Sequence, residues 1–361
     1  MRISVGRPRV TRVEVLAAAL VVSILFGEGL ARWLGLASPP GGDRIRWWTQ
    51  FIRPSDAPLL VWELVPGAAV EGREAHGSVL YRVNSMGLRG RAIDPRKGSG
   101  VFRVLALGDS FTFGLEGSEE DSLPSQLERL ANARSSVRIE VLNGGTPGYN
   151  TRQELAWLLQ RGLTLEPDLV ILGVAVGDVD PIMLQQWPAQ VPQELWPNPE
   201  AARRPRSNGP ASSAGGLDDW LKQRSALYEL ATSRWDALLV RSGLREPGGL
   251  GVLGDYQSRE WLWLRGAVQE MQVALRRRGV GFAIWIYPSP EELSRERWPV
   301  LGSLFQRWSD ESGVPIVDLW PVFRQRHWRP LFRVFGHLTG EGNEIAAETV
   351  LGFLVTKGLL P

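Results

Sequence analysis

Short apolar runs alternate with amphipathic stretches from Val101 to the end of the chain. Five of the runs have the length and β-branched content of buried parallel strands, at residues 101–107, 137–143, 168–176, 280–288 and 314–319. Helical periodicity marks the stretches at residues 121–133, 151–163 and 258–279. A strand and helix alternation of this kind predicts an α/β domain with a doubly wound parallel sheet.

A different pattern occupies the amino terminus, where an apolar run at residues 15–27 follows a basic flank. The arginines of this flank are Arg2, Arg7, Arg9 and Arg12. A positive flank before an apolar run predicts export or anchoring, with the first residues kept in the cytoplasm. The run is short for a spanning helix, which needs about 20 residues, so Glu28 and Arg32 would have to lie near the far interface.

Three interpretations of this segment follow. Residues 1–37 form an N-terminal membrane helix that serves as a signal anchor, or a signal peptide that is cleaved near Ala37, or a buried amphipathic helix. In the first case the main domain lies outside the cytoplasm, at the periplasm or cell surface, and remains attached to the membrane. In the second case it is secreted.

The remaining chain divides into a lead-in and a main domain. Residues 38–100 are punctuated by Pro and Gly, and we expect a membrane-proximal lead-in that ends in a small extended subdomain. Residues 101–361 form the main domain, with an insertion at about 185–256 between the third and fourth strands. Residues 197–216 have the composition of a mobile loop, which predicts a lid or a linker.

Composition excludes several classes of function. The chain of 361 residues has a formal net charge of +2 and no basic run interleaved with aromatic residues, so nucleic-acid binding has no support. The absence of cysteine excludes disulfides and thiolate metal ligands. Neither His76 nor His327 has acidic or histidine neighbours at metal-ligand spacing, and the segment "GDSFTFG" lacks a phosphate-loop ending. We therefore expect no metal and no cofactor.

Ser110 is the first candidate for chemistry. It follows the first predicted strand directly, at the carboxyl edge of the sheet where doubly wound folds place ligands. Its sequence context "VLALGDSFTFG" also fits a simple turn. A glycine-rich loop at residues 141–150 ends the second strand, and His337 lies in a loop after the last strand, within reach of the same edge.

The blocks "ALGDSFTFG", "VLNGGTPGYN", "LVILGVAVGDVDP" and "FGHLTGEGNE", in this order, resemble the GDSL or SGNH hydrolase family. The resemblance covers about residues 80–355 and includes the lead-in "YRVNSMGLRG". It implies a flavodoxin-like three-layer α/β/α sandwich with a five-stranded parallel sheet. It also implies that Ser110 is the nucleophile, that His337 is the base, and that the backbone N–H groups of Ser110 and Gly148 bind the oxyanion.

Two residues of the family pattern are absent. The third block carries Gly177 before Asp178, where the family has an Asn that donates to the oxyanion. Before the histidine of the last block the chain carries Val334 and Phe335, where the family has an Asp that orients the histidine. A backbone carbonyl, a water molecule or Asp318 at the end of the fifth strand is left to orient His337, and Asp318 also fits a capping role. Asp178 is the other weak candidate, at a position that is usually structural.

These features predict a serine ester hydrolase or O-acyltransferase that acts through an acyl-enzyme on envelope glycan or lipid esters. The two absences favour an alternative, a catalytically decayed pseudoenzyme that serves as a binding or assembly component. The sequence leaves open the substrate, the acyl chain, the choice between hydrolysis and transfer, and the oligomeric state.

Overall fold

The computed structural model describes residues 12–33, 50–57, 59–74, 77–179, 256–294, 299–333 and 336–361, with single positions between 221 and 238. The chain forms two compact units, which we describe separately. Residues 1–46 and 205–246 make up one unit, and residues 47–204 and 247–361 make up the other. Most of the predicted insertion, together with Val334 and Phe335, lies outside the described residues.

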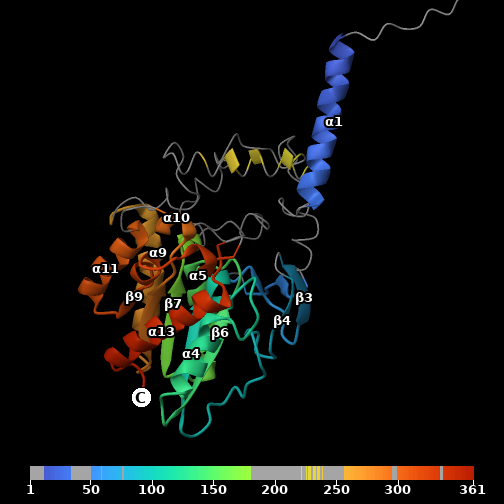
Figure 1. Ribbon diagram of the computed structural model, residues 1–361. Coiled ribbons are helices and arrows are strands. Elements are labelled where there is room, and N and C mark those ends of the chain that lie inside the picture. Colours follow the sequence, from blue (N-terminus) through green and yellow to red (C-terminus); the bar gives the residue numbers. More distant parts are fainter. Residues whose placement is uncertain are drawn as a thin grey trace, which may run out of the picture. The chain divides into compact units, whose positions relative to one another are not determined.

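The larger unit is built on a five-stranded parallel sheet, as predicted (Figure 1). Its strands are β5 (Val101–Gly108), β6 (Arg138–Gly145), β7 (Leu169–Val174), β8 (Gly281–Ile286) and β9 (Ile316–Asp318). They lie in the order β6-β5-β7-β8-β9, which is the flavodoxin-like order. Because β5 has β6 on one side and β7 on the other, the strand order reverses at β5, and ligands bind beyond its carboxyl end in folds of this type.

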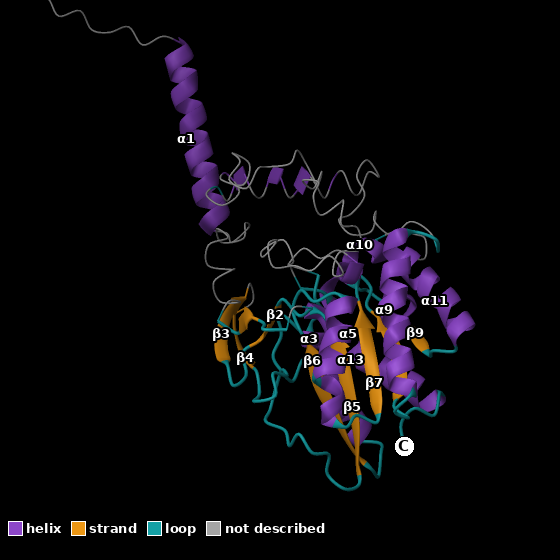
Figure 2. Cartoon of the chain, turned by 180° about the vertical axis from the view of Figure 1, so that it is seen from behind, coloured by secondary structure: helices purple, strands orange, loops and turns teal. Residues whose placement is uncertain are grey.

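Helices cover both faces of the sheet (Figure 2). The long ones are α4 (Leu123–Asn132), α5 (Thr151–Gln160), α9 (Arg259–Arg276), α11 (Val300–Ser312) and α13 (Gly340–Thr356). Short helices are α3 (Ser110–Phe113), α10 (Pro290–Leu293) and α12 (Trp320–Arg324), with 3-10 turns η1 (Gly162–Leu165), η2 (Val176–Val179) and η6 (Arg329–Leu331). The predicted helices at 121–133, 151–163 and 258–279 correspond to α4, α5 and α9.

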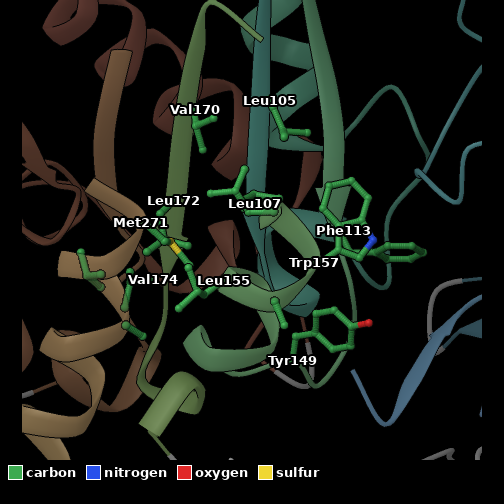
Figure 3. Close-up of a cluster of buried hydrophobic side chains, with 14 of the residues drawn as sticks. Leu105, Leu107, Phe113, Tyr149, Leu155, Trp157, Val170, Leu172, Val174 and Met271 are labelled. Atoms are coloured by element: carbon green, nitrogen blue, oxygen red, sulfur yellow. The ribbon is translucent and has the colours of Figure 1, made fainter. Parts of the chain in front are cut away.

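Side chains along each strand alternate between two separate cores. In β5, Leu105 and Leu107 join the core that contains α5 and α9, whereas Val104 and Ala106 join the core that contains α4 and α13. Figure 3 shows the first of these cores, in which Leu105 and Leu107 lie near β7 side chains and Met271 of α9. Successive side chains of a strand point to opposite faces of the sheet, and here both faces are buried. The sheet with helices on its two faces therefore forms a three-layer structure.

Residues 50–100 add two small antiparallel pairs to this unit. The pairs are β1 (Ile52–Pro54) with β2 (Trp62–Leu64), and β3 (Ala69–Glu74) with β4 (Gly77–Arg82). Trp62 is fully buried, donates its indole N–H to the Pro147 carbonyl at 3.2 Å, and accepts the Tyr149 hydroxyl on its own carbonyl at 2.6 Å. The lead-in therefore shares the core with the loop that follows β6.

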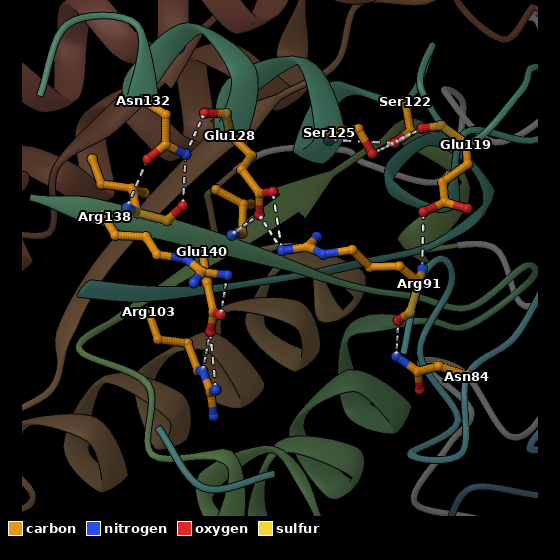
Figure 4. A network of polar contacts seen from close by, with 12 residues as sticks. Asn84, Arg91, Arg103, Glu119, Ser122, Ser125, Glu128, Asn132, Arg138 and Glu140 are labelled. Carbon is orange, nitrogen blue, oxygen red and sulfur yellow. Dashed lines mark hydrogen bonds and ion pairs between the residues drawn. The ribbon is translucent and has the colours of Figure 1, made fainter. Parts of the chain in front are cut away.

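Charged side chains pair at the amino end of the sheet (Figure 4). The buried guanidinium of Arg103 donates to Glu140 at 3.0 Å and to the carbonyls of Asp94, Pro95 and Leu165. These contacts satisfy a buried cation, which would be costly without them.

In the smaller unit, α1 (Arg12–Trp33) covers much of the predicted membrane segment. The Glu28 carboxylate in α1 accepts hydrogen bonds from the Ser225 hydroxyl at 2.8 Å and the Leu227 N–H at 2.9 Å. Within the described ranges we find no helix that is both long and apolar enough to cross a membrane.

Candidate active site

Ser110 is the first residue of α3, directly after the tight turn that ends β5. The Asp109 carboxylate accepts the Phe111 N–H at 2.8 Å and so caps the start of α3. Strand β6 runs so close that a Cβ on Gly145 would lie 2.2 Å from the Phe113 nitrogen, which explains the glycine at that position. As the first residue of α3, Ser110 has a backbone N–H without an intrahelical acceptor, and its side chain remains partly exposed.

His337 approaches Ser110 from a loop before α13. Gly336 has φ +86°, a conformation that favours glycine, and the Arg333 N–H donates to the His337 carbonyl at 2.7 Å. The result is a buried imidazole whose Nε2 lies 2.9 Å from the Ser110 hydroxyl oxygen. The structure thus brings together the two residues that the sequence singled out as nucleophile and base.

A carboxylate holds the other side of this imidazole. Glu116 Oε2 lies 2.9 Å from His337 Nδ1, and the Glu116 side chain is 2% exposed. The group at His337 Nδ1 is therefore neither the family's Asp nor one of the groups that the sequence left open. This carboxylate lies six residues after Ser110 and just beyond the first block, whereas the family pattern places it before the histidine.

The two contacts of His337 fix its tautomer. An ionised carboxylate only accepts hydrogen bonds, so His337 Nδ1 carries the proton and donates it to Glu116. His337 Nε2 then presents a lone pair that accepts the Ser110 hydroxyl proton. This is the arrangement that a general base next to a serine requires.

Gly148 and Gly177 lie in the loops after β6 and β7. The Thr146 N–H donates to the Gly108 carbonyl at 2.9 Å, which ties the turn that contains Gly148 to the end of β5. Gly177 lies in η2, and a Cβ built on it would meet only Asp109 Oδ2, at 3.5 Å. Position 177 therefore has room for a side chain and provides no side-chain donor.

The two weak candidates make other contacts. Asp178 accepts the Ala175 N–H at 2.7 Å, and Asp318 accepts the Trp320 N–H at 2.8 Å. Neither contacts His337 by any hydrogen bond found here, since the two imidazole nitrogens face Ser110 and Glu116. The position that an orienting Asp318 would need, at His337 Nδ1, is taken by Glu116.

Three more carboxyl groups are buried around the same edge. Burial raises the pKa of Asp109 to about 6, although the hydrogen bond from Phe111 and the charge of His337 lower it. Burial, followed by the neighbouring carboxylates, also raises the pKa values of Glu154 and Asp178. In the described part of the chain no cluster of three His, Asp or Glu residues could hold a metal ion.

Glu116 is the functional residue that the sequence interpretation missed. The sequence does contain a hint of this role. Because the Asp that usually accepts the histidine Nδ1 proton is absent, a carboxylate from another loop at the same edge of the sheet can accept it instead. Glu116 lies in such a loop between Gly114 and Gly117. Its φ of +66° is rare for a residue with a side chain, and strain of this kind gathers at functional sites.

A comparison with known protein families matches the chain to one of them. The sequence profile of the GDSL-like lipase/acylhydrolase family matches residues 106–345. No curated protein matches the chain.

Solved structures similar to this chain include a lipase/acylhydrolase from Enterococcus faecalis, with 14% identity, TM-score 0.41, and coverage of 72% of this chain and 97% of that one. A catalytic variant of an acetylxylan esterase from Geobacillus stearothermophilus has 15% identity, TM-score 0.41, and coverage of 72% and 95%. For a family 3 carbohydrate esterase from Clostridium thermocellum the values are 15%, 0.40, 72% and 100%. Because the profile spans well over half of its length, the chain belongs to the GDSL-like lipase/acylhydrolase family.

Proposed function

We propose that the protein is a serine ester hydrolase or O-acyltransferase that forms an acyl-enzyme on Ser110. The observation that carries this proposal is the unbroken hydrogen-bonded line from Glu116 through His337 to Ser110. A serine hydroxyl is a weak nucleophile, and a neighbouring base held by a third group is the arrangement that activates it.

In the first half of the reaction, the Ser110 oxygen attacks the ester carbonyl carbon while His337 Nε2 takes the hydroxyl proton. The tetrahedral intermediate collapses, the bond to the leaving alcohol breaks, and His337 returns the proton to that alcohol. Water, or the hydroxyl of an acceptor, then attacks the acyl-enzyme by the same steps and regenerates Ser110. Glu116 accepts the Nδ1 hydrogen bond and stabilises the imidazolium that forms twice in each cycle.

The oxyanion binds to the backbone N–H groups of Ser110 and Gly148. Gly177 supplies no third donor, and the loss of one donor costs about 10²- to 10³-fold in a well-studied protease. The resulting enzyme is slower than a relative with the full donor set, but it keeps the nucleophile, the base and the orienting carboxylate.

Gly177 also favours the alternative function, a decayed member of the family that binds an ester or assists assembly. The two functions differ in one property, the reactivity of Ser110. A decayed site keeps the fold and leaves an ordinary serine hydroxyl.

A serine-reactive fluorophosphonate tests this difference on the purified full-length chain. We expect the wild type to be labelled and Ser110→Ala to lose the label, while Ser118→Ala, a matched change in the same segment, keeps it. Labelling that persists in Ser110→Ala would place the nucleophile elsewhere. A folded wild type that takes no label would favour the decayed site.

The substrate that we propose is an ester of an envelope glycan or lipid, with the larger unit outside the cytoplasm. The support is the basic flank before the apolar run of residues 15–27, which is typical of exported chains. The chain then stays attached through this segment or is released by cleavage near Ala37.

Reporter fusions and the mature amino terminus test this location. A reporter fused after Leu36 should be active outside the cytoplasm, and activity only in the cytoplasm would contradict export. A mature protein that starts near Ser38 would replace the anchor with a cleaved signal.

A further inference from the structure

A buried arginine from the lead-in reaches the loop that carries Glu116. Arg89 follows β4, is 4% exposed, and donates its backbone N–H to the Asn143 carbonyl at 3.1 Å. Its side chain contacts the segment directly after the nucleophile turn, so a part of the chain that precedes the sheet enters the surroundings of the site.

The guanidinium of Arg89 binds three backbone carbonyls around Glu116. One terminal nitrogen donates to the carbonyls of Phe113 and Gly114, the latter at 2.5 Å, and the other donates to Gly117 at 2.6 Å. Among the described residues no hydrogen bond joins Arg89 to a carboxylate, and the hydrogen bonds of its guanidinium go to the backbone of this loop. The planar fork of an arginine makes such contacts to several carbonyls at once, which a lysine cannot reproduce.

Aromatic rings hold the guanidinium in place. Its central carbon lies 5.0 Å from the centre of the Tyr81 ring and 4.5 Å from that of Phe113, within the range of cation–π contacts. Phe51 stacks on both rings, at 5.8 Å from Tyr81 and 5.6 Å from Phe113. The lead-in therefore supplies two fully buried rings, Phe51 and Tyr81, that pack beside the Glu116 loop.

Tyr81 of β4 makes the contact nearest to the carboxylate. Its hydroxyl accepts the Glu116 backbone N–H at 2.9 Å and donates to the Glu74 carboxylate at 2.6 Å. Burial and Glu74 raise the pKa of Tyr81, so the hydroxyl stays protonated and keeps both bonds. The bond to Glu116 restrains the residue whose φ is +66°.

From these contacts we infer that Arg89 and Tyr81 are positioning residues of the active site, which hold Glu116 in a strained conformation where its carboxylate meets His337. The lead-in is then a working part of the catalytic centre. This inference rests on the proposed function, in which Glu116 orients His337.

The test compares two buried arginines in the full-length chain. Arg89→Lys removes the fork at the Glu116 loop, whereas Arg103→Lys removes an equally buried fork at the opposite end of β5. We expect Arg89→Lys to lower kcat by about 10- to 100-fold with little change in KM, because small displacements of a catalytic group have effects of this size. Arg103→Lys should lower stability and leave kcat near that of the wild type. Equal kcat values in the two folded variants would overturn the inference.

Tyr81→Phe keeps the test decisive if Arg89→Lys fails to fold. It retains the ring and removes only the hydroxyl that accepts the Glu116 N–H. We expect a decrease in kcat of about 3- to 10-fold, with none in Tyr256→Phe, which removes a hydroxyl bonded to Glu311 on a distant part of the unit. A kcat of Tyr81→Phe equal to that of Tyr256→Phe would contradict the inference.

A proton NMR measurement separates failure of this inference from failure of the proposed function. The His337 Nδ1 proton that bonds to Glu116 should give a low-field resonance in the wild type and in Arg103→Lys, and it should weaken or move in Arg89→Lys. If the wild type neither hydrolyses esters nor takes the fluorophosphonate, the proposed function fails, and this resonance alone decides whether Arg89 positions Glu116. A resonance that is identical in all three proteins would overturn the inference.

Discussion

The two ends of β5 handle buried charge in different ways. At the amino end each buried or half-buried charge meets an opposite one, with Arg103 on Glu140 at 3.0 Å and Lys97 on Asp168 at 2.5 Å. At the carboxyl end the Arg89 guanidinium donates to backbone carbonyls and lies over two aromatic rings, and the Glu116 carboxylate contacts the His337 imidazole.

The difference separates structural from chemical use of charge. The ion pairs at the amino end are already complete in the folded protein, so they contribute to its stability and do not take part in chemistry. In the proposed reaction the imidazole takes the proton of Ser110, and the Glu116 carboxylate oxygen at His337 Nδ1 then faces a positive charge. Groups whose charge is completed only during a reaction are typical of active sites.

The largest effect should come from Glu116→Gln. A neutral amide cannot stabilise the imidazolium, so we expect esterase activity or the fluorophosphonate labelling rate to fall by about 10³- to 10⁴-fold, since the equivalent change in a protease triad costs about 10⁴-fold. Glu140→Gln is the control at the amino end, where it should lower the melting temperature and leave the rate unchanged. A loss of less than tenfold in Glu116→Gln would mean that Glu116 does not orient His337.

The fold could be predicted from the sequence because its signal is local. The apolar runs at 101–107 and 280–288 have the length and composition of buried strands wherever their neighbours lie, and the structure places β5 and β8 there. The cap at Ser258 is equally local, since its hydroxyl accepts the Trp261 N–H one turn later.

Of the two hydrogen bonds that His337 makes, only the one to Ser110 could be predicted from the sequence. Ser110 and His337 stand in blocks that strand ends carry to one edge, so their meeting follows from the order of the strands. The contact between Glu116 and His337 joins residues 221 positions apart, and it depends on a left-handed backbone conformation that Arg89 and Tyr81 support from a third segment. No spacing in the sequence shows such a long-range arrangement.

The next effect concerns the carboxyl end of β7, where Gly177→Asn should raise activity. Gly177 does not have a positive φ, and the new Cβ would make an ordinary contact with Asp109, so the change should be tolerated. An Asn amide that reaches the oxyanion should raise kcat by about tenfold or more, which corresponds to about 1.4 kcal/mol of barrier. Gly177→Ala is the control, because it adds the Cβ without a donor. Equal rates for the two variants would mean that a side chain at 177 does not reach the oxyanion.

A smaller effect on stability should follow from Glu154→Gln in the first turn of α5. Burial raises the pKa of Glu154, so the folded state keeps this proton above the ordinary glutamate value of 4.5, near which the unfolded chain releases it. The contribution of Glu154 to stability is therefore present at low pH and is lost as pH rises from about 4.5 through the folded pKa. Glu154→Gln has no proton to lose.

Chemical denaturation at several pH values tests this sign. Near pH 4 the Glu154→Gln variant and the wild type should have similar free energies of unfolding. Near pH 8 the variant should be more stable by about 1 to 3 kcal/mol, the usual cost of a buried polar group without partners. Glu270→Gln, an exposed change in the partner of Arg152, should follow the wild type at every pH. A Glu154→Gln advantage that shrinks with rising pH would show that Glu154 is stabilised as a carboxylate.

The smallest effect should come from Phe335→Asp, which restores the residue type that the family carries before its histidine. On the sequence alone, this change and Gly177→Asn together predict a gain in activity, because His337 then has no orienting carboxylate. In the structure Glu116 already occupies His337 Nδ1 at 2.9 Å, and an imidazole has only one hydrogen to donate from that nitrogen. We therefore expect Phe335→Asp to leave kcat within about twofold of the wild type, and to recover activity only when it is combined with Glu116→Gln.

The wild type, the two single variants and the double variant form a double-mutant cycle that measures this coupling. A gain in Phe335→Asp alone would show that Glu116 orients His337 incompletely, and a double variant as inactive as Glu116→Gln would show that only the Glu116 loop can deliver a carboxylate to this nitrogen.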